Sequence, residues 1–385
     1  MIRVLYVTHY SKLYGANLSL LDLIDIIRSK EKLIPYVVMP SSGPLLQELR
    51  KRKIRYFVLP FRNWIHRNIS GWEQAASLVI IAKKTIELLI NRVLARILSH
   101  LLQNQRIDLV HTNTSVTNFG AVIALKLSVP HIWHMREYGK EDYNVEFDWG
   151  TANAYAFMAA SSAKIIAISD DLKKKYLRYH NSSKIMTIYN GIKIRKLSSL
   201  KKKSSNYINL IMVGLLTPGK GHTVAIHALR ILVDKGYKNI ILNIVGDGRE
   251  LRKLMNIVKK EELKRHVVFH GYIDQPYRLM ANADIGLQCS TKEAFGRVLV
   301  EYMVSGIPVI ASESGASREI ISSTGLLFRT GDPEDLAKKI EMLLTNSKMM
   351  MKFRKVGRDR ASNLFNIGLT GRKIFKLYKA SLSKH

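Results

Sequence analysis

The chain has 385 residues, which is too long for one small domain, and its 47% of hydrophobic residues is enough to fill two buried cores. Its 61 lysines and arginines against 30 aspartates and glutamates give a formal net charge of +31, which favours polyanions or anionic membranes as partners. A single cysteine, Cys289, excludes an internal disulfide framework and a four-cysteine zinc site, and it suits a reducing compartment.

Short apolar runs alternate with helical patterns through the first half of the chain. The expected strands lie at residues 3–8, 36–39, 109–111, 131–134 and 164–167. The expected helices lie at residues 17–27, 44–52, 118–127 and 170–179, the last with Ser169 as its N-cap. This alternation predicts a parallel sheet with helices on both faces.

Residues 190–206, with a run of lysines and serines, interrupt the alternation and are the best linker candidate. Strands are expected beyond it at 209–213, 240–245, 267–271, 284–288 and 308–311, and helices at 222–235, 249–260, 277–282 and 296–305. The fold class is therefore α/β, with two Rossmann-like, doubly wound parallel-sheet domains facing a cleft. In such sheets ligands bind beyond the carboxyl ends of the strands.

The segment 64–102 is different, because it is long, helical in pattern and basic. Residues 50–106 contain 12 basic and 2 acidic residues, and Trp64 and Trp72 precede apolar residues near helical spacing. Two interpretations stay open: a helix that faces the core with a solvated basic side, or a helix that lies in a membrane interface. A second basic stretch, 348–384, has 11 basic residues against Asp359 alone and is expected to be a solvated helix face.

Export and membrane-spanning signals are not visible in the sequence. The longest uncharged run, 109–125, contains seven polar residues, whereas a spanning helix needs about 20 mostly apolar ones. We expect a soluble protein of the cytoplasm that binds the inner face of the cell membrane at its surface.

Two glycine-containing turns follow predicted strands. In the first, Gly214 opens a loop that ends at Lys220, so that backbone and a positive charge meet at a helix N-terminus, where an anion can bind. In the second, Gly246 opens an Asp-Gly turn that can form the floor of a site. Taken alone, the first motif could equally be a tight turn with a surface lysine that binds no anion. The second could equally be an Asp-Gly turn without a ligand.

The third motif is the most specific. Glu293 stands three residues before Gly296, which is expected to open a helix, and Glu301 lies eight residues after Glu293. A carboxylate inside that helix can accept two hydrogen bonds from a cis-diol. The backbone N–H groups near Phe295, Gly296 and Arg297 can bind a phosphate. The alternative is a capping acid followed by a solvated glutamate.

Together these motifs resemble the pattern of glycosyltransferase family 4, group 1, a family of retaining enzymes with the two-domain GT-B fold. The resemblance extends to Tyr14-Gly15-Ala16-Asn17 and Asp108-Leu109-Val110-His111 in the first half, and to the Gly306-Ile307-Pro308-Val309-Ile310 run that follows Glu301. It implies an N-terminal acceptor-side domain at 1–190, a linker at 191–206 and a nucleotide-sugar domain at 207–365. A C-terminal helix at 366–385 can pack back on the first domain.

The resemblance also implies an activity, namely transfer of a sugar by a glycosyltransferase of the hexosyltransferase type. The donor would be a nucleotide sugar such as a UDP- or GDP-sugar, and the acceptor a glycan or lipid-linked molecule in the synthesis of a bacterial capsule, exopolysaccharide or lipopolysaccharide. Neither a metal nor another cofactor is expected. An anionic membrane surface is an expected partner, and a specific nucleic acid is not.

By the matching positions, the resemblance gives each site residue a role. Glu301 would hold the ribose and Glu293 the donor sugar, while Lys220 would neutralise the diphosphate together with the backbone at residues 295–297. Gly15 would let a loop of the first domain approach the phosphates, and His134 would face the donor sugar. Gly214 and Gly246 would belong to the donor site.

One position departs from the family pattern. Leu215 stands where the family has an arginine, so one of two phosphate cations is missing. Arg297 is near enough in sequence to replace it, with Lys292 as a weaker candidate. His111 is expected to be structural, and Arg136 and Glu137 either bind a substrate or pair with each other.

Two other function classes stay open. A polyanion-binding protein without catalytic activity explains the charge but not Glu293, Glu301 and Lys220 at their spacings. A sugar-nucleotide epimerase on the same fold explains those residues but releases no nucleoside diphosphate.

Overall fold

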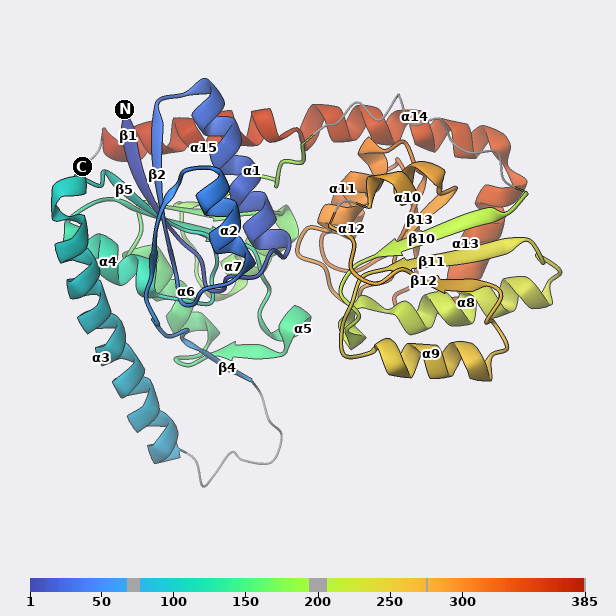
Figure 1. Cartoon of the computed structure of the whole chain (residues 1–385), viewed down its shortest axis with the longest axis horizontal. Coiled ribbons are helices and arrows are strands. Elements are labelled where there is room, and N and C mark those ends of the chain that lie inside the picture. Colours follow the sequence, from blue (N-terminus) through green and yellow to red (C-terminus); the bar gives the residue numbers. More distant parts are fainter. Residues whose placement is uncertain (68–76, 194–205, 275, 384–385) are drawn as a thin grey trace. The chain divides into compact units, whose positions relative to one another are not determined.

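The computed structural model describes residues 1–67, 77–193, 206–274 and 276–383. The chain divides into two compact units, which are described separately (Figure 1). Unit 1 comprises Met1–Gly191 together with Ile367–His385, and unit 2 comprises Ile192–Asn366. The chain thus returns to unit 1 for its last helix, α15 (Ile367–Leu382).

Unit 1 contains a seven-stranded parallel sheet in the order β3-β2-β1-β5-β6-β8-β9. Its strands are β1 (Ile2–Val7), β2 (Leu33–Met39), β3 (Arg55–Val58), β5 (Leu109–Thr112), β6 (His131–Met135), β8 (Lys164–Ala167) and β9 (Ile185–Thr187). Its helices besides α15 are α1 (Gly15–Lys30), α2 (Pro44–Lys51), α3 (Ser77–Leu102), α4 (Phe119–Leu127), α5 (Lys140–Tyr143), α6 (Thr151–Ala160) and α7 (Asp170–Tyr179).

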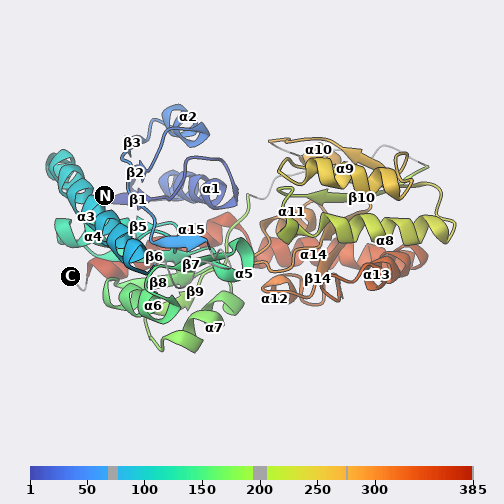
Figure 2. The ribbon, with the colours of Figure 1, turned by 90° about the horizontal axis from the view of Figure 1, so that it is seen from below.

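The inner strand β1 shows why these strands are short runs of mostly apolar residues. Val4 and Tyr6 pack into a core formed with α1, α2 and α15, whereas Leu5 and Val7 pack into a second core formed with α3 and α4. Successive side chains of a strand point to opposite faces, so a strand covered by helices on both faces is apolar at every position. Figure 2 shows these helices on the two sides of the sheet.

Unit 2 repeats the arrangement with a six-stranded parallel sheet in the order β12-β11-β10-β13-β14-β15. Its strands are β10 (Ile208–Val213), β11 (Ile240–Val245), β12 (Val267–Phe269), β13 (Ile285–Gln288), β14 (Val309–Ser312) and β15 (Leu326–Phe328). Its helices are α8 (His222–Asp234), α9 (Leu251–Lys260), α10 (Tyr277–Asn282), α11 (Arg297–Val304), α12 (Ser317–Ile321), α13 (Pro333–Thr345) and α14 (Ser347–Leu364).

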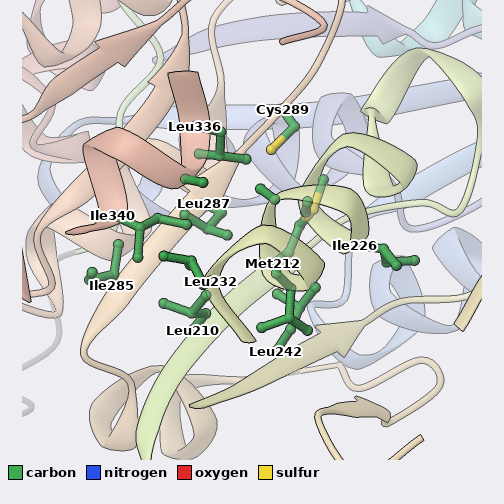
Figure 3. Packing of buried hydrophobic residues seen from close by; sticks show 14 of the residues in the cluster. Leu210, Met212, Ile226, Leu232, Leu242, Ile285, Leu287, Cys289, Leu336 and Ile340 are labelled. Atoms are coloured by element: carbon green, nitrogen blue, oxygen red, sulfur yellow. The ribbon is translucent and has the colours of Figure 1, made fainter. Parts of the chain in front are cut away.

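The core of unit 2 lies between this sheet and the helices α8, α9 and α13. Leu210 and Met212 of β10 and Leu287 of β13 pack there against Leu232 of α8 and Leu336 of α13 (Figure 3). Cys289 lies in the same core, where burial raises the pKa of its thiol to about 12, so that it behaves as a small apolar residue.

The prediction of one long helix over 64–102 is wrong at its start. Residues Ile65–Arg67 form β4, which pairs antiparallel with β7 (Val145–Phe147), and the described part of the helix begins at Ser77. Trp64, for which both a core-facing and a membrane-facing interpretation were open, is buried and stacks on Trp133, with the ring centroids 5.7 Å apart. Trp72 lies outside the described residues. Across the described ranges, every helix is too short or too polar to span a bilayer.

Candidate functional site

The loop that carries Lys220 follows β10 and ends at the start of α8. Gly221 has a φ of +70°, and a Cβ built on it would lie 2.0 Å from the backbone oxygen of Cys289, so only glycine fits there. The backbone N–H of Thr291 donates to the carbonyl of Gly219 over 2.9 Å. These contacts join the Lys220 loop to the loop that follows β13, and both loops lie at the carboxyl edge of the sheet.

Lys220 and Glu293 form an ion pair at this edge. The Lys220 Nζ donates to Glu293 Oε2 over 2.8 Å, and the two side chains are 32% and 17% exposed. Gln288 Nε2 and Ser290 Oγ donate to the same carboxylate oxygen over 3.2 and 3.1 Å. The sequence motifs identified Lys220 and Glu293 but not these two donors, although Gln288 is a polar residue in an otherwise apolar strand.

The protonation state of Glu293 is fixed by these neighbours. Burial alone would raise the pKa of its carboxyl, but the charge of Lys220 and the hydrogen bonds from Lys220, Ser290 and Gln288 outweigh burial and hold the pKa below its ordinary value. Glu293 is therefore an anion at neutral pH, and the backbone carbonyl of the same residue is held by the N–H of Ala316 over 2.8 Å.

The two glycine turns lie side by side. Gly246 has a φ of +145°, and a Cβ built on it would lie 1.9 Å from the carbonyl oxygen of Gly214. Gly214 itself has no atom within 4 Å of such a Cβ, so its Cα faces open space. The hydroxyl of Tyr302, on α11, accepts a hydrogen bond from the N–H of Val213 over 2.9 Å and thereby supports the end of β10.

The helix α11 starts where the sequence predicts, with Gly296 as its N-cap at a φ of +78°. Glu293 lies in the preceding loop, and Glu301 lies in the second turn, where its Oε1 accepts from Arg297 Nε over 2.8 Å. Phe295 is buried and meets Phe365 edge to face, with the ring centroids 5.6 Å apart. The first N–H groups of an α-helix have no acceptor within it, so this end of α11 favours an anion.

Leu215 is half-buried in the Lys220 loop. The side chain predicted to replace the missing arginine, Arg297, lies on α11 and binds Glu301. Whether Arg297 serves a phosphate stays a prediction.

In unit 1, His134 and Gly15 also lie at the carboxyl edge of a sheet. His134 is 1% exposed, and its Nε2 is buried without a hydrogen-bond partner. Burial lowers the pKa of His134 well below its ordinary value, and the charge of Arg136 lowers it further, so the imidazole is neutral. Gly15 opens α1, and a Cβ built on it would meet no atom within 4 Å.

Arg136 and Glu137 are buried, and the backbone N–H of Arg136 donates to Oε2 of Glu137 over 3.3 Å, but most of the hydrogen bonds of the two side chains go to other residues. The guanidinium of Arg136 donates to Oδ1 of Asn113 over 2.7 Å and to Oδ1 of Asn190 over 2.6 Å. The carboxylate of Glu137 accepts from Thr114 and Ser115. Burial raises the pKa of Glu137, partly offset by these hydrogen bonds and by the charge of Arg136. The sequence singled out Arg136 but not Asn113 or Asn190 as its partners.

Metal ligands do not cluster in the described ranges of either unit. No three histidine, cysteine, aspartate or glutamate side chains come together there as a metal site would require.

Two family models match consecutive parts of the chain. Residues 35–196 match the model described as Glycosyltransferase Family 4, and residues 194–360 match the model described as Glycosyl transferases group 1. Together the two matches cover both units except for the ends of the chain.

Individual relatives match different shares of the chain. The protein CapJ of Staphylococcus aureus is 31% identical over 194 residues, but the match spans only about half of each protein, 48%. The UDP-Gal:alpha-D-GlcNAc-diphosphoundecaprenol alpha-1,3-galactosyltransferase of Escherichia coli is 23% identical, over 96% of this chain and 97% of that protein.

A solved structure shares the fold. The Anabaena protein Alr3699/HepE, determined in complex with UDP and glucose, superposes with a TM-score of 0.77 at 20% sequence identity, over 99% of this chain and 100% of that one. With both family models matched and this fold shared, the chain belongs to the group 1, family 4 glycosyltransferases, and it has their GT-B fold of two parallel-sheet α/β domains.

Proposed function

We propose that the protein transfers a hexose, with retention of configuration, from a nucleotide-sugar donor to a glycan or lipid-linked acceptor during the synthesis of a bacterial surface polysaccharide. The observation that carries this proposal is the Lys220–Glu293 ion pair at the carboxyl edge of the unit 2 sheet, where ligands of such sheets bind. The likeness to the galactosyltransferase of Escherichia coli, whose name gives a nucleotide-sugar donor and a lipid-linked acceptor, supports the same classes of donor and acceptor.

In this proposal the leaving group is a nucleoside diphosphate, so catalysis needs positive charge where negative charge develops. Lys220 supplies a full charge and the N-terminus of α11 a partial one. Glu301 would accept the ribose hydroxyls, and Glu293 would accept a hydroxyl of the donor sugar. In unit 1, the unpartnered Nε2 of His134 suits a contact to a sugar hydroxyl.

The donor class can be tested directly with the purified protein. A panel of UDP-, GDP- and ADP-sugars should contain one nucleotide that raises the unfolding temperature, because a ligand that binds only the folded state at 100 times its Kd adds about 2.7 kcal/mol. With that donor, nucleoside diphosphate should be released in step with acceptor added, and the product should keep the anomeric configuration by NMR. Release without acceptor dependence, or an inverted product, would contradict the proposal.

Transfer should not depend on an added divalent cation. In the proposed mechanism, Lys220 and the α11 N-terminus stabilise the negative charge of the leaving diphosphate, which a metal ion stabilises in other transferases. Turnover in excess EDTA should equal turnover in its absence, measured with metal-free buffer as the control. Loss of turnover in EDTA that Mg²⁺ or Mn²⁺ restores would show that a metal carries part of the charge.

Substitutions at Gly214 and Gly246 distinguish the loss of a contact with the donor from a loss of folding stability. Gly214→Ala adds a methyl group where the protein has no atom within 4 Å, so the unfolding temperature should stay within about 2 °C for a change worth only tenths of a kcal/mol. Donor affinity should fall by about tenfold if the diphosphate approaches this backbone, as one misplaced contact is worth about 1–2 kcal/mol. Calorimetry measures the affinity of the variant for the donor, and a melting curve measures its unfolding temperature.

The matched control is Gly246→Ala, which should destabilise the fold itself because its Cβ would meet the carbonyl of Gly214. Its melting temperature should drop even without donor. Unchanged donor affinity in Gly214→Ala would show that the phosphates bind elsewhere.

We further propose that the protein attaches to the inner face of the cell membrane through α3. Five apolar residues on this helix are each about half exposed and recur every three or four positions, which places them in one row: Ile86, Leu89, Val93, Ile97 and Leu101. The exposed residues Arg92 and Arg96 flank the row, while Ala95, Leu98 and Leu102 pack into the core. An apolar row beside cations is typical of interfacial helices.

The test is co-sedimentation with vesicles of increasing anionic lipid. The protein should bind anionic vesicles at low salt and less at high salt, because exposed charges are screened. Replacing Leu89, Val93 and Ile97 with serine should abolish binding, whereas Leu125→Ser, which removes an exposed leucine from α4, should not. Equal binding to neutral and anionic vesicles, or none, would exclude an electrostatic anchor. A wild-type dimer that the triple variant loses would assign the row to a second copy.

A further inference from the structure

A line of hydrogen-bonded side chains in unit 1 joins the C-terminal helix to His134. Tyr6 on β1 lies beside His111 on β5, and His111 lies beside Ile132 on β6. His134 is two residues after Ile132, so its side chain lies on the same face of the sheet. The helix α15 covers this face and brings Tyr378 to it.

The distances make the line continuous. The Tyr378 hydroxyl lies 3.2 Å from that of Tyr6 and 2.7 Å from His111 Nδ1. His111 Nε2 lies 3.1 Å from His134 Nδ1, and Arg136 Nη2 lies 3.4 Å from the same nitrogen. All five side chains are buried. Within this line, His134 Nε2 at its end is buried and has no hydrogen-bond partner among the described residues.

The positions of the protons follow from the chemistry of these groups. A guanidinium has no acceptor atom, so a contact with Arg136 requires a lone pair on His134 Nδ1. His111 Nε2 then carries a proton and donates it to His134 Nδ1, which leaves a lone pair on His111 Nδ1. The Tyr378 hydroxyl has one proton, and we assign it to the shorter of its two contacts, the 2.7 Å contact with His111 Nδ1, and not to the Tyr6 oxygen at 3.2 Å. A neutral imidazole has one N–H, so the proton of His134 is on Nε2.

We infer that His111 and Tyr378 are positioning residues, which hold the proton of His134 on Nε2 and thereby make that nitrogen a hydrogen-bond donor to the sugar of the nucleotide-sugar donor. The inference rests on the proposed function for the sugar contact, whereas the placement of the proton rests on the line of side chains alone. A donor buried without a partner is costly in the unliganded protein, and a sugar hydroxyl that accepts from it removes that cost.

Tyr378→Phe is the variant that tests this, since it removes one hydroxyl and keeps the ring that packs in the core. The ¹⁵N signals of the His134 ring report which nitrogen is protonated. The wild type should show a protonated Nε2 and an unprotonated Nδ1, and in Tyr378→Phe the two signals should move toward each other as both tautomers become populated. Tyr176→Phe is the matched control, because it removes a buried hydroxyl bound to the carbonyl of Tyr155 in the same unit.

Two variants at His111 test whether the effect of Tyr378→Phe comes from a change of structure. In His111→Phe the bond to His134 Nδ1 is lost, and in His111→Gln an amide N–H can replace it, so the ¹⁵N pattern should change in the former and recover in the latter. An unchanged His134 pattern in folded Tyr378→Phe and His111→Phe, or the same change in Tyr176→Phe, would overturn the inference.

Measurements of turnover test the same inference independently. Tyr378→Phe should lower kcat by about tenfold, the effect of one hydrogen bond, with little change in the KM for the donor. In a His134→Ala background the same substitution should change kcat by less than twofold, because Tyr378 acts through His134. A tenfold effect that persists in this background would overturn the inference. Full activity of His134→Ala alone would instead remove the proposed sugar contact, and the ¹⁵N measurement would still decide where the proton lies.

Discussion

Replacing Lys220 with methionine should lower kcat/KM by a factor of about 10²–10³, the range measured when one preorganised donor to a developing negative charge is removed. Methionine keeps the length and apolar stem of lysine but not its charge. The loss should appear in kcat as well as in KM, because the negative charge of the leaving diphosphate grows as the transition state forms.

The same substitution should also reduce the free energy of unfolding, because it leaves Glu293 largely buried without its counter-ion. Removing one partner of a part-buried charged hydrogen bond costs about 1–3 kcal/mol. Lys235→Met is the matched control, since Lys235 pairs with Glu341 over 2.7 Å at the surface of the same unit. Such an exposed pair contributes about 0–1 kcal/mol, and Lys235→Met should leave kcat/KM unchanged.

The pH dependence of stability distinguishes this account from a simple loss of packing. In the wild type the pKa of Glu293 is below its ordinary value of 4.5, so the stabilisation is present above that pH and is lost as the pH falls through the folded-state pKa. In Lys220→Met burial dominates and the pKa of Glu293 rises. The stability difference between the two proteins should therefore be largest near neutral pH and shrink in acid, which denaturant titrations at several pH values would measure. A difference independent of pH would contradict the ion-pair account.

The buried strands of both sheets were predictable because a parallel strand covered on both faces is apolar at every position. The edge strand β3 was not, since Arg55 and Val58 are exposed and leave no apolar run. The pairing of β4 with β7 joins residues about 80 positions apart, and nothing in the local sequence of 65–67 indicates its partner. Trp64 directly precedes this strand and is buried, whereas its residue type alone left both the core and a membrane interface open.

In the site, too, features that depend on neighbouring residues were predictable, and contacts between residues far apart in the sequence were not. Gly296 and Glu301 were placed correctly because the start of a helix depends on a few neighbouring residues. The contact of Lys220 with Glu293 joins positions 73 residues apart, and only the resemblance to a family put both at one site. The contact between His111 and Tyr378 spans 267 residues, so only a structural role could be predicted for His111 from the sequence.

Glu301→Ala should weaken donor binding by about 1.5–3 kcal/mol, the contribution of charged hydrogen bonds to the ribose hydroxyls. The Oε1 of Glu301 binds Arg297 in the structure, so the substitution also releases a cation near the N-terminus of α11. Released, Arg297 would bind the diphosphate more freely and offset part of the loss. Calorimetry should therefore show a larger loss for Glu301→Ala in an Arg297→Ala background than in the wild type.

The contribution of Arg297 can be separated through Leu215, the position where the family has an arginine. Arg297→Ala should reduce turnover by about 10–100-fold if this side chain supplies the second phosphate cation, as removal of one charged hydrogen bond costs about 1.5–3 kcal/mol. Adding Leu215→Arg to that variant should restore part of the turnover, because the new guanidinium lies in the same loop as Lys220. Full turnover of Arg297→Ala, with no effect of Leu215→Arg, would mean that Lys220 and the α11 N-terminus carry the diphosphate without a second cation. Unchanged donor affinity in folded Glu301→Ala would remove the ribose role of that residue, whatever the outcome for Arg297.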